Sequence, residues 1–254
     1  MANAPAAANA LDVLEHLSRH AEPVPAAAIA RDLGLPRSSV YHLLKVLGGR
    51  GYVTHYTRER RFGLGCAAYE LGSAYQRQTP LGRLARATIR RLVDEVGRNA
   101  HFATLDGHDV IYLLEERAVG QPTLVTDVGV RLPAHLTASG LAMLSALPQS
   151  RIRALYRDRA VLVQRTGHGP TSLTELRGLL ARTRAEGFAR EDGTVTPDIS
   201  SVGVPVLDRA RRPFAAIALT FRSQDGSADH LAELVAATRS AATDIARRIG
   251  ATAP

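Results

Sequence analysis

Several residue types and patterns are scarce in this chain of 254 residues. Cys66 is the only cysteine, so no internal disulfide can form, which fits a reducing compartment. No apolar run approaches the roughly 18 residues that a membrane-spanning helix needs. The Ala-rich start lacks the basic and apolar regions of a signal peptide. These absences predict a cytoplasmic protein.

The patterns of common enzyme classes are also missing. The only lysine, Lys45, stands in neither a phosphate-binding loop nor an S-x-x-K motif, and the chain has no H-E-x-x-H or G-x-S-x-G. The nine histidines are scattered, which argues against a metal site. Ser139 and His135 could be a nucleophile and a base, but their spacing gives no reason for hydrogen-bond geometry. We therefore expect no enzyme activity, no metal and no cofactor.

One glycine-rich stretch resembles a dinucleotide-binding loop. Residues 63–68 read G-L-G-C-A-A after an expected strand and before an expected helix. A dinucleotide site would also need a second parallel strand and an acidic residue about 20 positions further on. The sequence after residue 68 shows neither, so we expect no nucleotide cofactor here.

Positive charge is concentrated in the first hundred residues. Residues 1–66 hold eight Arg and Lys against five Asp and Glu, and residues 67–100 hold six against three. Residues 101–254 hold eighteen against sixteen. A basic segment followed by a nearly neutral one indicates a nucleic-acid-binding module joined to a second domain.

Residues 10–65 have the pattern of a winged helix-turn-helix. Apolar spacing predicts helices at about 10–20 and 26–33. Gly34 ends the second helix in a left-handed conformation, and Ser38 or Ser39 is expected to cap a third helix after Pro36. Two short strands around a basic tip follow. The Ala-rich residues 1–9 are expected to be disordered.

The third helix and the basic tip carry the expected DNA contacts. The polar face of the helix has hydrogen-bond donors and no acidic residue, which suits a recognition helix in the major groove. A basic wing contacts phosphates or the minor groove. The expected DNA-binding residues are Arg37, Ser38, Ser39, Tyr41, His42, Lys45, Arg58, Arg60 and Arg61.

The rest of the chain predicts an α+β domain. A linker helix region at 66–80 precedes a long helix at 81–96 and a domain that extends to residue 254. Two hairpins are expected, around Asp106–His108 and Asp208–Arg212, with a third strand at 124–128. The expected helices lie at 138–147, 151–157, 173–186 and 228–249.

Three segments in this order resemble the IclR family of transcription factors. The first is Ile29–Leu44, with Gly51-Tyr52-Val53 downstream; the second is Val128–Gly140. The third comprises Glu186–Ala189, Ser201–Val206 and Pro213–Ile217. The resemblance covers nearly the whole chain. It implies a winged helix-turn-helix, a linker helix and a C-terminal GAF-like mixed sheet with flanking helices that binds an effector and forms oligomers.

The resemblance also implies partners and a second site. The partners are a palindromic double-stranded DNA operator, a small organic effector and a homodimer or dimer of dimers, with no membrane. The effector carboxylate is expected at the N-terminus of the 138–147 helix, which attracts anions. Matching positions give Ala138, Ser139, Glu191, Ser201, Ala218 and Thr220 as effector-binding residues.

Departures from the family pattern suggest the kind of effector. Thr194 stands where relatives often have Glu, Asp198 where they often have Gly, and Ala218 where they often have Ser. One pocket wall should therefore be less polar than in relatives that bind very small keto acids. We expect an aromatic or branched carboxylic acid.

The expected function is a ligand-responsive regulator, with repression favoured because a bound protein blocks polymerase by default. Two alternatives stay open. One is an activator of the same family, because the sequence does not encode the direction of regulation. The other is a ligand-independent architectural DNA-binding protein, which would have a filled core around Ala138, Ser139 and Thr220 rather than a cavity.

Overall fold

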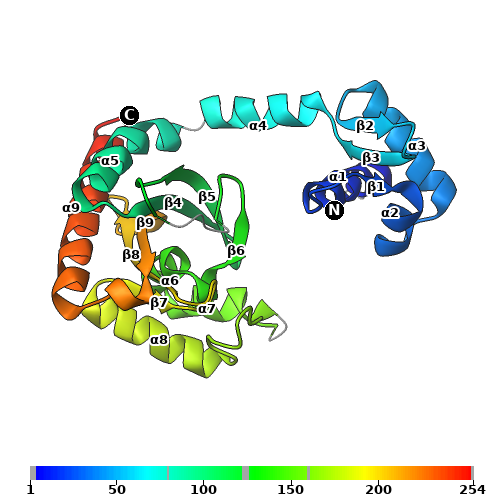
Figure 1. Ribbon diagram of the computed structural model, residues 1–254. Coiled ribbons are helices and arrows are strands. Elements are labelled where there is room, and N and C mark those ends of the chain that lie inside the picture. Colours follow the sequence, from blue (N-terminus) through cyan, green and yellow to red (C-terminus); the bar gives the residue numbers. More distant parts are fainter. Residues whose placement is uncertain (1–3, 79, 122–125, 159–160, 253–254) are drawn as a thin grey trace. The chain divides into compact units, whose positions relative to one another are not determined.

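The computed structural model describes residues 4–78, 80–121, 126–158 and 161–252, which form two compact units. The first unit ends at Gln78 and the second begins at Thr79, so residues 66–78 of the expected linker are grouped with the first unit. Figure 1 shows the helices and strands of each unit. Among the described residues, no helix is both long enough and apolar enough to cross a bilayer.

The first unit is a helical head with a small sheet. Helices α1 (Pro5–Ser18), α2 (Ala26–Asp32) and α3 (Arg37–Gly49) pack around a core that includes Val13, Ile29 and Val40. Strands β1 (Val24–Pro25), β2 (Val53–Tyr56) and β3 (Arg61–Leu64) pair antiparallel in the order β1-β3-β2. Helix α4 (Cys66–Gln78) follows. The predicted winged helix-turn-helix is present, with Gly34 at φ +65° as expected.

Two local predictions for the head were wrong. The predicted disorder of residues 1–9 fails at residues 5–9, because α1 already begins at Pro5. Proline suits the first helical position and the alanines after it have the highest helix propensity. The predicted serine cap of α3 is also absent, because the helix begins at Arg37 after Pro36 and has no side-chain cap. Ser38 and Ser39 lie inside its first turn.

The second unit is a six-stranded sheet covered by helices on both faces. Its strands are β4 (Asn99–Asp106), β5 (Asp109–Glu116), β6 (Arg131–Pro133), β7 (Ala189–Asp192), β8 (Ile199–Leu207) and β9 (Pro213–Arg222). They run in the order β6-β5-β4-β9-β8-β7. All five pairings are antiparallel, so the sheet is antiparallel rather than mixed within the α+β fold that we predicted.

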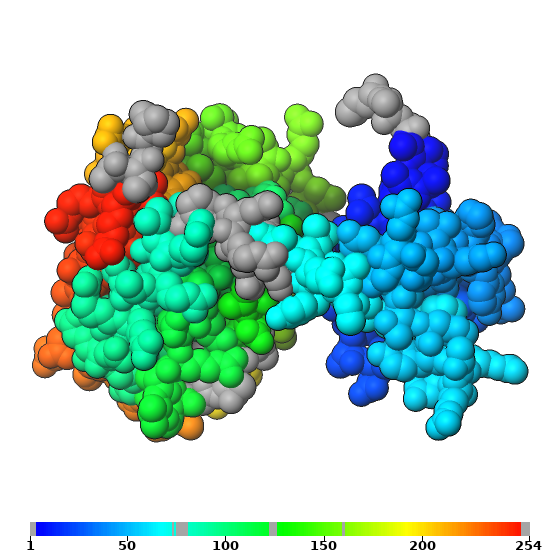
Figure 2. All heavy atoms as spheres, turned by 90° about the horizontal axis from the view of Figure 1, so that it is seen from above, coloured from blue at the N-terminus to red at the C-terminus, as the bar shows by residue number. Residues whose placement is uncertain are grey.

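Two layers of helices enclose this sheet. Helices α5 (Pro80–Val96) and α9 (Ala228–Thr252) lie side by side on one face, around a core that includes Ile89, Phe102 and Ile245. Their neighbouring surfaces are visible in Figure 2. Helices α6 (Ala138–Ser145), α7 (Gln149–Leu155) and α8 (Leu173–Glu186) belong to the other layer. Because both faces are covered, β9 is buried along most of its length.

The third strand lies later than the sequence suggested. Residues 122–125 of the predicted strand lie outside the described part of the chain, and Thr126–Val128 are not in a strand. The chain turns at Gly129, which has φ +85° and donates its backbone N–H to the carbonyl of Tyr112. Strand β6 forms only after this turn, opposite residues 109–111 of β5.

Candidate functional site

Helix α3 presents the predicted polar face to solvent. Its apolar side chains Val40, Leu44 and Leu47 are buried against the other helices of the head. The opposite face carries the six predicted contact residues, of which only Ser39 is partly buried; the others are Arg37, Ser38, Tyr41, His42 and Lys45. This exposed face has donors and no carboxylate, so it can approach the edges of bases and the phosphates.

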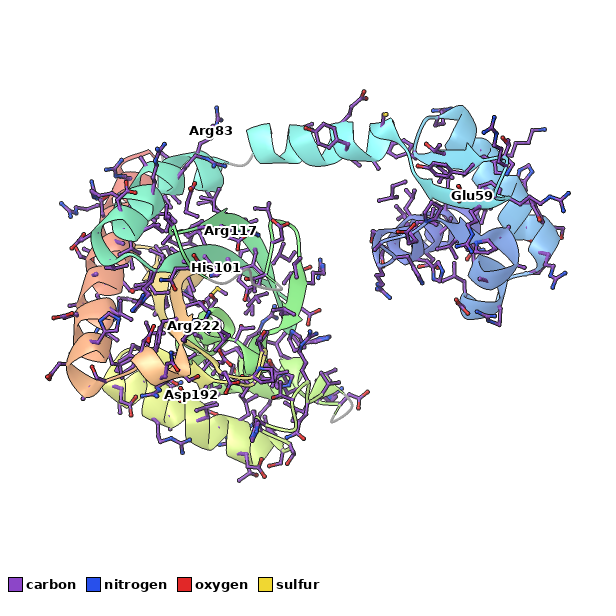
Figure 3. All side chains as sticks on the ribbon, in the orientation of Figure 1. Glu59, Arg83, His101, Arg117, Asp192 and Arg222 are labelled. Carbon is purple, nitrogen blue, oxygen red and sulfur yellow. The ribbon has the colours of Figure 1, made fainter. Side chains whose placement is uncertain are left out.

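The other three predicted DNA-binding residues lie in the wing, and they have different surroundings. Arg58 and Arg60 are exposed on either side of Glu59, which Figure 3 labels, and Arg60 has a left-handed backbone at φ +52°. Arg61 instead donates from Nη1 to the backbone carbonyl of Pro23 at 3.0 Å. Its guanidinium therefore helps to hold β3 against the chain that precedes α2.

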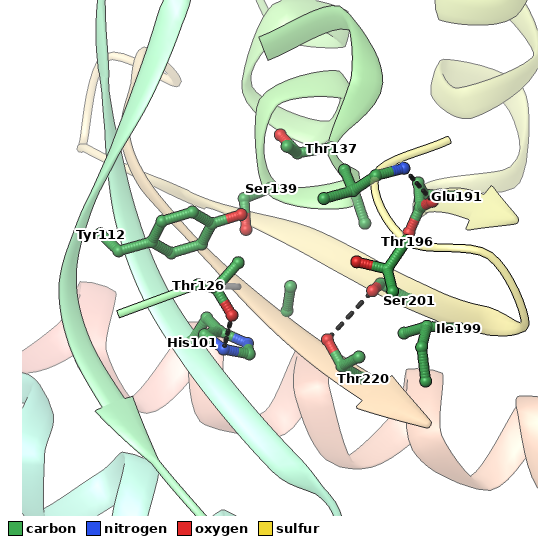
Figure 4. Close-up of a pocket in the computed structure, with 13 residues that line it drawn as sticks. His101, Tyr112, Thr126, Thr137, Ser139, Glu191, Thr196, Ile199, Ser201 and Thr220 are labelled. Carbon is green, nitrogen blue, oxygen red and sulfur yellow. Dashed lines mark hydrogen bonds between the residues drawn. The ribbon is translucent and has the colours of Figure 1, made fainter. Parts of the chain in front are cut away.

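A pocket in the second unit brings together all six residues expected to bind an effector. Ala138, Ser139, Glu191, Ser201, Ala218 and Thr220 line one cavity of about 30 Å³. The sequence missed seven further lining residues, which are His101, Tyr112, Thr126, Thr137, Val195, Thr196 and Ile199. Figure 4 shows polar side chains from several directions around the space.

The N-terminus of α6 forms one side of the pocket. Thr137 caps the helix, and its hydroxyl accepts the N–H of Gly140 at 3.0 Å. The first amides of a helix have no acceptor within it, so those of Ala138 and Ser139 can serve an anion. The Ser139 hydroxyl is buried and has no hydrogen-bond partner among the described residues. An uncharged donor and two amides therefore meet at this side.

Glu191 supplies a buried carboxyl at another side. Its Oε1 accepts the N–H of Thr194 at 2.6 Å, the Thr194 hydroxyl at 2.9 Å and the N–H of Val195 at 3.2 Å. Nearby, the hydroxyls of Ser201 and Thr220 are 3.0 Å apart. Burial raises the pKa of Glu191 above its ordinary value despite these donors.

The raised pKa makes Glu191 a source of pH-dependent stability. Between the pKa of the unfolded chain, 4.5, and the higher folded value, the folded protein holds more protons than the unfolded one. The contribution of Glu191 to the free energy of unfolding is therefore full below pH 4.5 and is lost as the pH rises through the folded pKa. Glutamine has no proton to lose, so as the pH rises through this range the free energy of unfolding of Glu191→Gln should increase relative to that of the wild type. Urea unfolding of both proteins at a series of pH values measures this, and parallel pH profiles would contradict it.

The third side of the pocket is built around His101, which the sequence treated as one of several scattered histidines. Its Nε2 is 2.8 Å from the Thr126 hydroxyl and 3.6 Å from Oε1 of Glu115. Glu115 accepts a hydrogen bond from Arg117 at 2.9 Å, and Figure 3 labels His101 and Arg117. Burial raises the pKa of Tyr112, whose ring meets His101 edge-on, so its hydroxyl stays neutral. This side can hydrogen-bond a polar group of a ligand.

The register of β4 against β9 is the signal that could have placed His101 in the pocket. It lies directly opposite Ala218 in the pairing of β4 with β9, so the two side chains share a face of the sheet. Ala218 was expected in the pocket, but the neighbour of β9 was not known from the sequence. His135, in contrast, does not line the pocket, and its Nε2 donates to the carbonyl of Val163 at 2.9 Å. His135 is therefore not placed to act as a base for Ser139.

Metal chemistry has no visible support in the described part of the chain. Within it, no group of three or more His, Cys, Asp and Glu side chains is arranged to hold a metal ion.

Comparisons with known proteins agree on one family. Residues 6–55 match the IclR helix-turn-helix domain, and residues 73–247 match the C-terminal domain of bacterial IclR transcriptional regulators. The chain is 30% identical to the Pca regulon regulatory protein of Pseudomonas putida over 83% of this chain and 72% of that one. It is 25% identical to the acetate operon repressor of Salmonella typhimurium, over 95% and 89% of the two chains.

A solved structure agrees with the fold. An IclR homologue of Microbacterium hydrocarbonoxydans, solved in complex with 4-hydroxybenzoate, superposes with a TM-score of 0.81 at 22% identity. The match covers 97% of this chain and 100% of the homologue.

Proposed function

The chain belongs to the IclR family of bacterial transcriptional regulators, and on that premise we propose that it represses transcription until an aromatic or branched carboxylic acid binds in the α6 pocket. It is a DNA-binding regulator and not an enzyme. The direction of regulation and the effector are the proposed parts. The acetate operon repressor among its relatives supports repression.

The observation that carries the proposal is the pocket itself. The first two amides of α6 have no acceptor within the helix, and the Ser139 hydroxyl has no partner among the described residues, so this helix N-terminus suits a carboxylate. Tyr112, Val195 and Ile199 offer apolar surface for a carbon skeleton. A cavity lined by Ala138, Ser139 and Thr220, rather than a filled core, also argues against the architectural alternative.

An aromatic acid with a second polar group fits the opposite side of the pocket. His101 and Thr126 stand across the space from the start of α6 (Figure 4), where they can meet a hydroxyl. The 4-hydroxybenzoate complex of the Microbacterium homologue supports this class of ligand. A dry cavity of roughly 150 Å³ accepts benzene, so the 30 Å³ space must expand when such a ligand binds.

We also propose a homodimer on a palindromic operator. Apolar side chains on the head are exposed, including Leu11 at 60%, Tyr69 at 79% and Leu71 at 61%. Leu11 lies on α1, and the other two lie on α4. Pairing of two heads would cover such side chains and would give the two-fold symmetry that a palindrome matches.

A mobility-shift titration tests the function. The DNA upstream of the protein's own gene and of neighbouring genes is titrated with and without benzoate, 4-hydroxybenzoate, branched aliphatic acids and small keto acids. A specific shift that an aromatic or branched acid releases supports the proposal. A shift that such an acid tightens indicates either the activator alternative or an acid that acts as a co-repressor. Release by small keto acids alone contradicts the proposed effector class, and the absence of any specific shift contradicts the regulator itself.

Ser139→Ala should separate effector binding from folding. Loss of a hydrogen bond to a charged group costs about 1.5–3 kcal/mol, so the releasing acid should act at least about tenfold more weakly. Stability should not fall, because the variant removes a buried hydroxyl that has no partner in the described part of the chain. The control is Ser145→Ala, at the other end of α6, where the hydroxyl bonds the carbonyl of Ala142. An unchanged response in Ser139→Ala would contradict the assigned role.

A further inference from the structure

The second unit contains another hollow that shares no lining residue with the α6 pocket. This hollow, which we term the arginine groove, has a volume of about 690 Å³. It lies among the end of α6, the helices α8 and α9, and the hairpin of β8 and β9, whose ribbons Figure 1 shows. Its volume falls in the usual range of small-molecule sites, roughly 300–1,000 Å³.

Three guanidinium groups line the arginine groove without a carboxylate partner. They belong to Arg184, Arg211 and Arg239, none of which forms an ion pair with a described residue. Asp208 is the one acidic side chain of the lining, and Arg212 pairs with it at 2.8 Å. The described lining therefore has a strong excess of positive charge, and its natural complement is an anion.

Two of these arginines are held in place by backbone carbonyls at helix ends. Arg184 donates from Nε to the carbonyl of Ser145 at 2.9 Å, and Arg239 donates from Nη2 to the carbonyl of Glu186 at 2.6 Å. Each of these hydrogen bonds caps a helix and uses one N–H of the guanidinium. Because a guanidinium has five N–H donors, four are left in each. The remaining donors are positioned in advance, which reduces the entropy lost when a ligand binds.

Arg211 cannot be explained by capping. Its backbone N–H donates to the carbonyl of Asp208 at 2.9 Å, but its side chain forms no hydrogen bond or ion pair with a described residue. Its backbone φ is +62° in the β8–β9 turn, where glycine would be relaxed. A strained arginine at the rim of a cationic hollow suggests a use for its side chain. The floor adds apolar surface from Phe188, Val204 and Ala242, with the Arg239 guanidinium 6.0 Å from the Phe188 ring centre.

We propose that the arginine groove binds a small organic polyanion, whose carboxylate or phosphate groups meet Arg184, Arg211 and Arg239 while its carbon body lies on the apolar floor. Forked guanidinium groups recognise both kinds of oxyanion, and several convergent ones favour a multiply charged ligand. This site is independent of the effector proposed for the α6 pocket. The protein would then respond to two ligands of different charge.

Calorimetric titration of the full-length protein with citrate and with pyrophosphate at constant ionic strength tests the proposal. Citrate represents polycarboxylates and pyrophosphate represents phosphates, so the two arms distinguish the source of the oxyanions. We expect saturable binding of at least one probe with one site per chain. The absence of saturable binding by both probes would overturn the proposal.

Arg211→Gly is the decisive variant, because glycine accepts the positive φ and the fold should lose nothing. We expect binding of the probe to weaken at least about tenfold, as for the loss of one charged hydrogen bond. Arg182→Gln is the matched control: it removes one exposed charge of α8 outside the groove and should leave affinity unchanged. Equal weakening in both variants would show only general charge attraction. Loss of probe binding in Ser139→Ala would assign the probe to the α6 pocket instead, and either result overturns the proposal.

Discussion

Replacing Arg37 by alanine should weaken binding to the operator about ten- to a hundredfold and change binding to unrelated DNA much less. Arg37 is the first residue of α3, is exposed and has no carboxylate partner among the described residues. A guanidinium there can bond the O6 and N7 atoms of guanine in the major groove, a contact worth about 1–3 kcal/mol of discrimination. Fluorescence anisotropy with operator and scrambled duplexes measures both affinities.

Arg60→Ala provides the contrasting variant. Arg60 stands at the wing tip, where a phosphate contact should add equally to the binding of any sequence. Its loss should weaken operator and scrambled DNA alike and reduce the salt dependence by about one phosphate contact. Arg19→Ala, which removes an exposed charge just after α1 that pairs with Glu15, is the control and should change neither affinity. Equal losses for Arg37→Ala and Arg60→Ala on both duplexes would refute the division of roles.

Gly140→Ala is expected to cost the second unit about 3 kcal/mol or more of its free energy of unfolding. A Cβ at Gly140 would overlap the backbone of Ala134, which cannot move aside as a flexible side chain could. On the other side of α6, a Cβ at Gly203 would meet the backbone of Ala138. The helix therefore sits directly against its neighbours, and the strain would displace the amides that face the pocket. Urea unfolding of the full chain measures the loss.

Gly178→Ala is the matched control with the opposite expected sign. Gly178 is an exposed position within α8, and nothing lies within 4 Å of an added Cβ. Alanine is the better helix former, so stability should rise by about 0.5–1 kcal/mol. If Gly140→Ala unfolds like wild type, the close packing of α6 does not limit the stability of this unit.

Local patterns were sufficient for much of the secondary structure. The predicted bounds of α8, 173–186, are those of the structure, and the turn predicted at Asp106–His108 does join β4 to β5. The left-handed Gly34 was equally clear, because a residue's conformational freedom is a local property. Failures at the start of α1 and at the predicted serine cap were errors of boundary rather than of type.

Local patterns did not predict which strands pair with one another when they are distant in the sequence. Strand β7, at residues 189–192, was not predicted, and the third strand was expected too early in the chain. A short strand is stabilised by its neighbour more than by its own residues, and nothing in the local sequence names that neighbour.

The sequence by itself determined the family, the winged head with its basic face, and the positions that an effector was expected to occupy. Tertiary structure alone decided that those six positions surround one cavity, that His101 joins them, and that three distant arginines line a second hollow. The physical reason is that helix period, turn residues and charge are written within short segments. A cavity depends instead on which strands lie side by side, as His101 opposite Ala218 shows.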